Sequence, residues 1–241
     1  MQYKLALQGI DLATYSFVVA ERVEDVAGKQ AIAVQSHAKA VGLVAMVAKL
    51  DDRFTSWIDV ETGRPVRFQT DEFATGSKTD IEHTVIDLAG RQGDQIPVTF
   101  HINDAAPTPE PQKVTASEIW DYNAFVVALR AWEGEPGTAL SAEVFRSRYL
   151  WHVDIKIRGK EKISTELAEL SEVTALRFDA HTYKLTRDGA KFPGNDERDF
   201  SVWISDDDGR VPLQTVAKTD YGDIKMKIVE YVAGSGARLR K

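Results

Sequence analysis

The sequence lacks several kinds of residue and motif, and each absence excludes a class of function. Its 241 residues include no cysteine, which excludes thiol catalysis, disulfide frameworks and thiolate metal sites. No apolar run approaches the roughly 20 residues that a helix needs to span a bilayer. Neither glycine-rich nucleotide fingerprint is present. We therefore expect a globular protein without a transmembrane segment, a nucleotide site or a reactive thiol.

Clustered positive charge is scarce as well. The formal net charge is −7, and the only basic run is the tail at residues 238–241. Non-specific nucleic-acid binding requires clustered Lys and Arg to neutralise phosphates, so we expect no nucleic-acid partner. The length favours one domain over residues 1–241, and the glycine-rich end predicts a flexible tail over residues 234–241.

Most of the chain alternates between apolar and polar residues with a period of two, which is typical of half-buried antiparallel strands. The clearest case is WHVDIKIR at residues 151–158, where Trp151, Val153, Ile155 and Ile157 share one face. The predicted strands are residues 3–7, 12–22, 31–37, 53–58, 66–73, 79–88, 96–102, 151–158, 173–185, 200–204, 211–218 and 223–232. About a dozen strands with tight turns predict a mainly β protein with one large antiparallel sheet that curls or closes.

One segment breaks this pattern and predicts a helix over residues 116–133. Thr115 and Glu118 fit a capping box at its start, and Gly134 fits a stop at its end. Residues 124–129 are apolar on every side, so we expect the helix to lie inside the curve of the sheet or under another segment. The expected cover is residues 38–50, whose secondary structure the pattern leaves open.

Two stretches of the chain match each other and predict the same hairpin. Each has an aromatic strand, a turn with glycine for a positive φ, and a proline opening the returning strand. The matching residues are Trp57, Gly63 and Pro65 in the first copy and Trp203, Gly209 and Pro212 in the second. The acidic run Asp206, Asp207 and Asp208 lies in the second turn. It lacks the ligand spacing of a calcium loop and precedes Arg210, so we predict a solvated turn and no metal there.

The order of these features resembles an uncharacterised family of bacterial envelope proteins, domain of unknown function 3108. The resemblance covers nearly the whole chain and rests on GLVA at 42–45, KLDDR at 49–53, TGRP at 62–65, DYNAFVVALR at 121–130, VWISD at 202–206 and RVP at 210–212. The chain departs from the expected pattern at residues 118–121 and 167–170. The resemblance implies a periplasmic or secreted protein whose curled sheet, an open barrel or β-spiral, is similar to that of lipoprotein carriers and wraps one central α-helix. It supplies no reaction. The first residues, MQYKLALQG, do not resemble a signal peptide, so we expect that any leader is missing from this sequence.

Candidate chemistry is sparse. His152 with Asp154 and Asp179 with His181 could together supply four metal ligands, but both pairs fall on the predicted solvent face of their strands. Ser235 lies between glycines in the predicted tail rather than on a strained nucleophile turn. We therefore expect no catalytic residues, no metal and no cofactor. A hydrolase or metalloenzyme would require the scattered His and Asp residues to converge.

Apolar residues offer the remaining site. They either line a cavity for an acyl chain or simply fill the core, and the sequence leaves both alternatives open. The candidates are Met46, Trp120, Phe125, Leu129, Trp132 and Trp151. The first functional hypothesis is a non-enzymatic envelope protein that binds a lipid or another apolar or amphiphilic ligand inside the curled sheet. The second is an interaction module that grips an envelope protein partner with its concave sheet or with an edge strand.

Overall fold

A computed structural model describes residues 1–42, 44–47, 49–74, 76–77, 79–167, 172–194 and 197–234. The fifteen strands of the main sheet are β1 (Gln2–Leu7), β2 (Ile10–Val26), β3 (Lys29–Ala40), β4 (Asp51–Asp59), β5 (Pro65–Phe73), β6 (Ile81–Asp87), β8 (Val98–Ile102), β9 (Thr108–Pro109), β11 (Ile119–Asp121), β12 (Ala139–Arg146), β13 (Tyr149–Ser164), β14 (Glu172–Lys184), β15 (Arg198–Ser205), β16 (Pro212–Thr219) and β17 (Gly222–Glu230). Strands β7 (Gln95–Ile96) and β10 (Gln112–Lys113) form a small second sheet. The helices are α1 (Val44–Val47) and α2 (Tyr122–Ala131).

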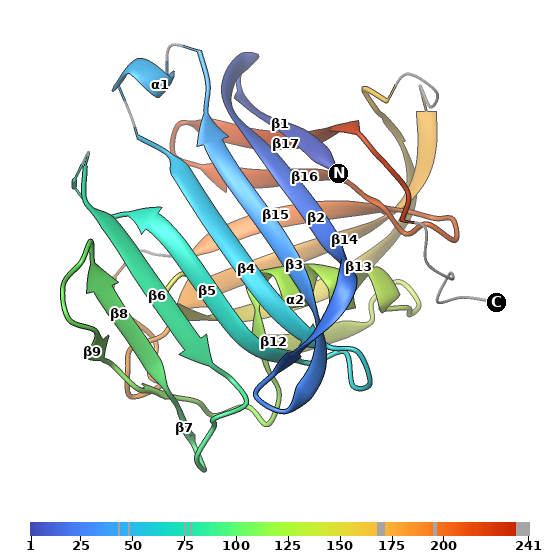
Figure 1. The fold of residues 1–241 in the computed structure, drawn as a ribbon. Coiled ribbons are helices and arrows are strands. Elements are labelled where there is room, and N and C mark those ends of the chain that lie inside the picture. The colour runs from blue at the N-terminus through green and yellow to red at the C-terminus, as the bar shows by residue number, and fades with distance from the viewer. Residues whose placement is uncertain are drawn as a thin grey trace.

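The main sheet runs in the order β11-β12-β13-β14-β15-β16-β17-β1-β2-β3-β4-β5-β6-β8-β9. All neighbouring strands are antiparallel except β11 and β12. The first strand of the chain therefore pairs with the last, β1 with β17, near the middle of the sheet. The sheet curls round α2 but its two edges, β9 and β11, do not pair, so it stays open (Figure 1). In the part of the chain that the structure describes, no helix has the length and apolarity required to cross a bilayer.

The predicted strands are confirmed, with ends that differ by up to about six residues, except that residues 96–102 divide at Pro97 between β7 and β8, which belong to different sheets. The alternating pattern succeeds because each strand turns one face toward the core and the other toward solvent. In β13, for example, Val153, Ile155 and Ile157 are buried while Asp154 and Lys156 are exposed. Strand β12 was not predicted, although Val144 and Phe145 are part of the buried core.

The helix prediction is correct in kind but wrong at its start. The helix begins at Tyr122, with Asp121 as its N-cap, and ends at Ala131. The capping box is not formed, because Thr115 donates its hydroxyl to Glu143 and the Glu118 carboxylate accepts from Arg64. The three residues before Tyr122 form the edge strand β11 instead.

The N-terminal end of α2 is fastened to the sheet by buried polar groups. Asn123, fully buried, donates its amide to the carbonyls of Val34 at 3.1 Å and Phe54 at 3.3 Å, and accepts from the Ser36 hydroxyl at 2.7 Å. The Asp121 carboxylate accepts from the backbone N–H of Ala124 at 2.9 Å. These bonds fix the helix on β3 and β4, because leaving any of these buried groups unpaired would cost about 1–3 kcal/mol.

The C-terminal end of α2 is fastened by a reciprocal pair of arginines. Arg130 donates to the carbonyls of Gly209 and Arg210 at 2.8 and 2.9 Å. Arg210, only 6% exposed, donates back to the carbonyls of Arg130 and Trp132 at 3.0 and 2.8 Å. The turn between β15 and β16 is thereby locked to the last turn of the helix.

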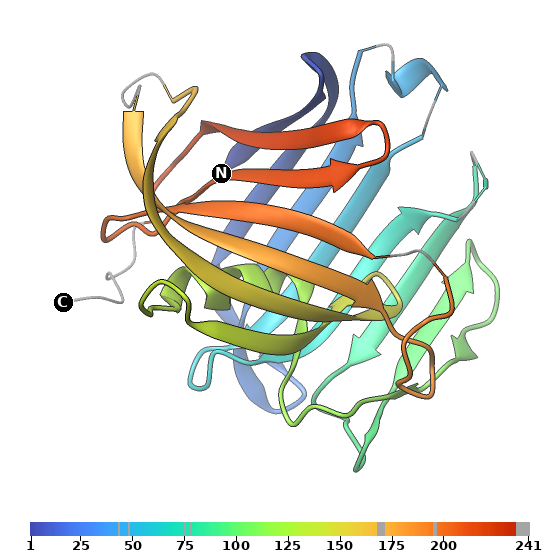
Figure 2. The same cartoon turned by 180° about the vertical axis from the view of Figure 1, so that it is seen from behind.

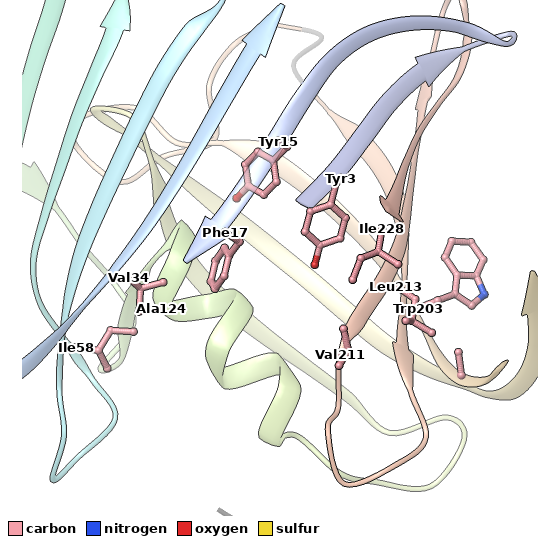
Figure 3. Packing of buried hydrophobic residues seen from close by; sticks show 11 residues of the cluster. Tyr3, Tyr15, Phe17, Val34, Ile58, Ala124, Trp203, Val211, Leu213 and Ile228 are labelled. Carbon is pink, nitrogen blue, oxygen red and sulfur yellow. The ribbon is translucent and has the colours of Figure 1, made fainter. Parts of the chain in front are cut away.

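Apolar residues from both ends of the sheet meet around α2. In one cluster Ala124 of the helix lies with Phe17 and Val34 from the N-terminal strands and with Val211 and Ile228 from the C-terminal ones (Figure 3). The predicted cover of the helix is wrong. Residues 38–40 complete β3, and α1 contacts β2 at the rim of the sheet, away from α2 (Figure 1). The opposite walls of the sheet cover the helix instead.

The sheet contains one four-stranded unit twice, as β2 to β5 and as β13 to β16; Figure 2 shows the second copy from the outside. The first two strands of each copy share a register shift at the same place. It falls between Val19 and Val23 in β2, and between Ile157 and Gly159 in β13. On one side of the shift Val19 pairs with Val34 of β3, as Ile157 pairs with Phe178 of β14. On this side of the shift the copies are therefore equivalent pair by pair, but the shift skips residues 20–22 in β2 and only Arg158 in β13.

The matched hairpins join the last two strands of each copy, β4 to β5 and β15 to β16. In both, the register shifts directly after the tryptophan, and the following isoleucine pairs with the proline. The residues are Trp57, Ile58 and Pro65 in the first copy and Trp203, Ile204 and Pro212 in the second. In both, the indole N–H donates to a glutamate two strands away, Glu24 or Glu161. The two hairpins predicted from the sequence are thus confirmed as one repeated structure.

The turns themselves differ from the prediction in one respect. Gly63 has the expected positive φ of 69°, but in the second turn the left-handed residue is Arg210, at 45°, and not Gly209. The acidic run of this turn serves local bonds. Asp207 accepts from the backbone N–H groups of Gly209 and Arg210, and Asp206 pairs with Lys160 at 2.6 Å.

We predict that the two turn arginines differ sharply in their contribution to stability. Arg210→Ala should lower the free energy of unfolding by about 2–3 kcal/mol, because the partly buried carbonyls of Arg130 and Trp132 lose their donors. Arg64→Ala, at the equivalent turn, removes a largely exposed ion pair to Glu118 and a cation–π contact with Trp120. It should cost about 1 kcal/mol. Urea denaturation of the two variants checks this, and equal losses would contradict it.

We also predict that stability depends on the ionisation of Asp121. Complete burial raises the pKa of its carboxyl to about 7, against hydrogen bonds that lower it. The folded protein therefore binds this proton more tightly than the unfolded chain, and stability falls as the pH rises from about 4 to 7. Asp121→Asn keeps an N-cap and should flatten this slope, measured by urea denaturation from pH 4.5 to 8. Burial also raises the pKa of Asp52, to about 6, but the resulting dependence of stability on pH is the same in the parent and in Asp121→Asn. Parallel curves would contradict the prediction.

Candidate functional site

The structure separates one of the predicted ligand-lining residues from the others. Met46 is 80% exposed on α1 at the rim. Trp120 on β11 and Trp151 on β13 are half-buried. Phe125, Leu129 and Trp132 come from α2 and its C-cap and point to the C-terminal half of the sheet. The placement of Met46 is therefore a correction, since it cannot lie beside the helix.

The residues that do meet are packed against the core. Phe125, Leu129 and Trp132 contact a cluster of buried side chains from β12 to β15, and the Trp132 ring lies 5.5 Å from that of Phe178. The Arg64 guanidinium covers Trp120 at 4.3 Å from its ring centre. These contacts are those of filled core, and a ligand-lining role for the set stays a prediction.

A groove of about 830 Å³ lies on the outer surface of β12 to β17. Its walls combine apolar and charged side chains from six strands. The lining residues are Ala139, Leu140, Ser141, Asp154, Ile155, Lys156, Arg158, Arg177, Asp179, Ala180, His181, Asp199, Phe200, Ser201, Trp203, Val216, Lys218 and Asp223. The strands that build it are those of the second copy of the repeated unit, with β12 and β17 beside them (Figure 2).

Trp203 forms part of the groove floor. Its ring points away from α2 (Figure 3) and is covered by the guanidinium of Arg177, whose central carbon lies 5.2 Å from the ring centre. Its indole N–H donates to the Glu161 carboxylate. The cation–π contact holds Arg177 flat over the floor rather than free in solvent.

The Asp179 carboxylate is the most highly coordinated acid of the groove. It accepts from Arg158 at 2.7 Å, from Arg177 at 2.8 Å and from the Ser201 hydroxyl at 2.7 Å. Burial opposes its ionisation, but these hydrogen bonds outweigh burial and hold the pKa of Asp179 below its usual value. The carboxylate is therefore charged at neutral pH and fixes both guanidinium groups.

The histidine pairs proposed from the sequence do not form one site. His152 Nε2 lies 3.2 Å from Asp154 Oδ1, as the spacing indicated. His181 pairs instead with Asp199, at 2.9 Å, and Asp179 is occupied by the arginines. Within the described ranges, no group of three or more His, Asp or Glu side chains is arranged to hold a metal ion. Ser235 lies outside the described residues.

Sequence reasoning missed the groove because its members are aligned only by strand register. Lys156, Asp179 and Ser201 form one cross-strand row on three strands, and Arg177 lies opposite Trp203. Each of these strands alternates normally and would predict an ordinary solvated face. The charged residues on the outer face of residues 151–158 could have indicated the groove. The residues of β14 and β15 that complete it lie about 20 to 45 residues further along the chain.

The fold defines this protein as mainly β, with one large open sheet and one short buried helix. A crystal structure of a beta-barrel-like protein of domain of unknown function DUF1849 from Brucella abortus is similar to it. The TM-score is 0.51 at 9% sequence identity, and the match covers 94% of this chain and 93% of that one. This likeness shows the fold alone.

A family model described as protein of unknown function (DUF3108) matches residues 2–229. The chain therefore belongs to the DUF3108 family, as the sequence motifs indicated. No curated protein matches the chain. The comparisons thus give a family and a fold but no reaction and no ligand.

Proposed function

We propose that this protein is a non-enzymatic component of the cell envelope, periplasmic or secreted, that binds an amphiphilic ligand on its curled sheet. The envelope location follows from the family resemblance, and a curled sheet similar to that of lipoprotein carriers suits such a ligand. The groove on β12 to β17 is the observation that carries the proposal. We place the ligand there, rather than around α2, because the helix and its aromatic neighbours already fill the inner curve.

The size and lining of the groove support this assignment. Its volume of about 830 Å³ lies within the range of small-molecule sites, about 300–1,000 Å³. Val216 and Trp203 are among the apolar residues that line it, and charged side chains stand beside them. A ligand with an apolar part and a polar part matches such a lining better than a purely apolar one.

The alternative, a module that adds a partner strand to its edge, has less support. The edge strand β9 is two residues long and includes Pro109, and the edge strand β11 is three residues long. Short edges and proline limit strand addition, because few backbone N–H and C=O groups are available to a new strand. A partner protein that binds the sheet face remains an outcome of the test below.

We predict that a discrete amphiphile is retained by the protein and is lost when the groove is filled. Val216→Trp places a large ring in the groove, whereas Gln69→Trp makes the same change at the equivalent position of the first copy. Native mass spectrometry of both variants and of the parent, with organic extraction, measures the bound species. The adduct should persist in the parent and in Gln69→Trp and fall at least about tenfold in Val216→Trp.

Two results would contradict the proposal. A parent protein at the bare polypeptide mass, after purification in mild conditions and exposure to dodecyl maltoside, would exclude a retained amphiphile. An adduct that survives in Val216→Trp would place the ligand outside the groove, with the surroundings of Phe125 and Trp132 next to be tested. A protein adduct instead of a lipid one would favour the interaction module.

A further inference from the structure

We propose that the groove recognises the anionic headgroup of its ligand, a phosphate or carboxylate, through Lys156, Arg158 and Arg177. This inference rests on the proposed function and specifies the ligand class. It is carried by two arginines that bond to a single carboxylate with Lys156 opposite it in register, and by the absence of Lys156 and Arg177 from the equivalent positions of the first copy of the unit.

The local charge around Asp179 is unbalanced. Arg158 and Arg177 both bond to this one carboxylate, and Lys156 is its register partner on β13. Lys156 has no ion-pair partner among the residues that the structure describes. Two guanidinium groups therefore share one carboxylate, in a chain whose formal net charge is −7.

The other acids of the groove are already engaged. Asp154 accepts from Ser141 and lies beside His152, and Asp199 lies beside His181. Asp223 is the register partner of Lys218 on the neighbouring strand. None of these carboxylates bonds to the three cations in the described part of the chain, and Glu161 accepts from the indole N–H of Trp203, which Arg177 covers. The N–H donors that Asp179 and Ser201 do not use are therefore open to an incoming anion.

The guanidinium groups are held in position for an incoming anion. Arg177 is fixed by Trp203 on one face and by Asp179 at Nε, and one terminal nitrogen lies 3.4 Å from the Ser201 hydroxyl. Arg158 uses Nε for Asp179 and its side chain is 54% exposed. A guanidinium bound at one edge keeps further N–H donors, which suit phosphate or carboxylate oxygens.

The first copy of the unit shows that the sheet does not need these charges. Its row equivalent to Lys156, Asp179 and Ser201 consists of Val18, Gln35 and Thr55. Opposite Trp57, where the second copy has Arg177, the first copy has Ala33. The two copies share the tryptophan and, up to the bulge, the same register, so the unit forms without a cation at the positions of Lys156 and Arg177.

The inference is tested by comparing two amphiphiles with the same chain, both kept below their micellar concentrations. Isothermal titration calorimetry should show dodecyl phosphate binding about tenfold more tightly than dodecyl maltoside. Arg158→Gln and Arg177→Gln should reduce this ratio to near one. Asp179→Asn should increase the ratio, because it removes the competing carboxylate. Arg53→Gln, an exposed arginine on the outer face of the first copy, is the control and should leave it unchanged.

The outcomes separate this inference from the proposed function. Equal binding of both amphiphiles, unchanged in Arg158→Gln and in Asp179→Asn, would overturn headgroup recognition and leave amphiphile binding intact. No binding of either would overturn both. Inorganic phosphate is titrated alone as well. If it binds as tightly as dodecyl phosphate, and depends equally on the arginines, the anion site stands but its ligand is a free anion.

Discussion

The fold depends on covering the inner face of a sheet that is too wide to be flat and does not close. That face carries apolar residues from most of its strands, and helix α2 is the element that lies against them. The helix has only ten residues, a length at which an isolated helix is marginal in water. Its stability therefore comes from its two attachments, Asn123 and Asp121 at one end and the Arg130 and Arg210 pair at the other. The same contacts hold the two halves of the sheet around the helix.

The sequence permitted the strands, the inner helix and the two hairpins to be predicted, because each rests on a local pattern. It left open whether the sheet curls or closes. Alternation fixes which face of a strand is buried, and the run at residues 124–129 could only belong to a covered helix. The start of α2 could not be predicted locally. Thr115 and Glu118 have the spacing of a capping box, but Glu143 and Arg64, distant in sequence, compete for them.

The candidate site was beyond the reach of sequence patterns for a related reason. Apolar residues are easy to recognise, and four of the predicted set, Trp120, Phe125, Leu129 and Trp132, did meet, but as packed core. The groove is formed by polar residues whose proximity depends on the register of β13, β14 and β15. An arginine on one strand and an aspartate on the next become a cluster only when the pairing is known. The register of these strands must therefore be known before the groove can be recognised from the sequence.

The pairing of β1 with β17 has a consequence for how the chain folds. All other neighbouring strands of the main sheet follow one another along the chain, with β7 between β6 and β8 and α2 between β11 and β12. Strands β1 and β17, in contrast, lie more than 200 residues apart. Strand β1 has only one partner until the ribosome has made nearly the entire described chain. Closing so long a loop is slow, and until it closes β1 and β17 leave unpaired backbone groups in the middle of the sheet. Such a protein is prone to aggregation late in synthesis, when the two halves of the sheet are nearly complete but β1 and β17 have not yet paired.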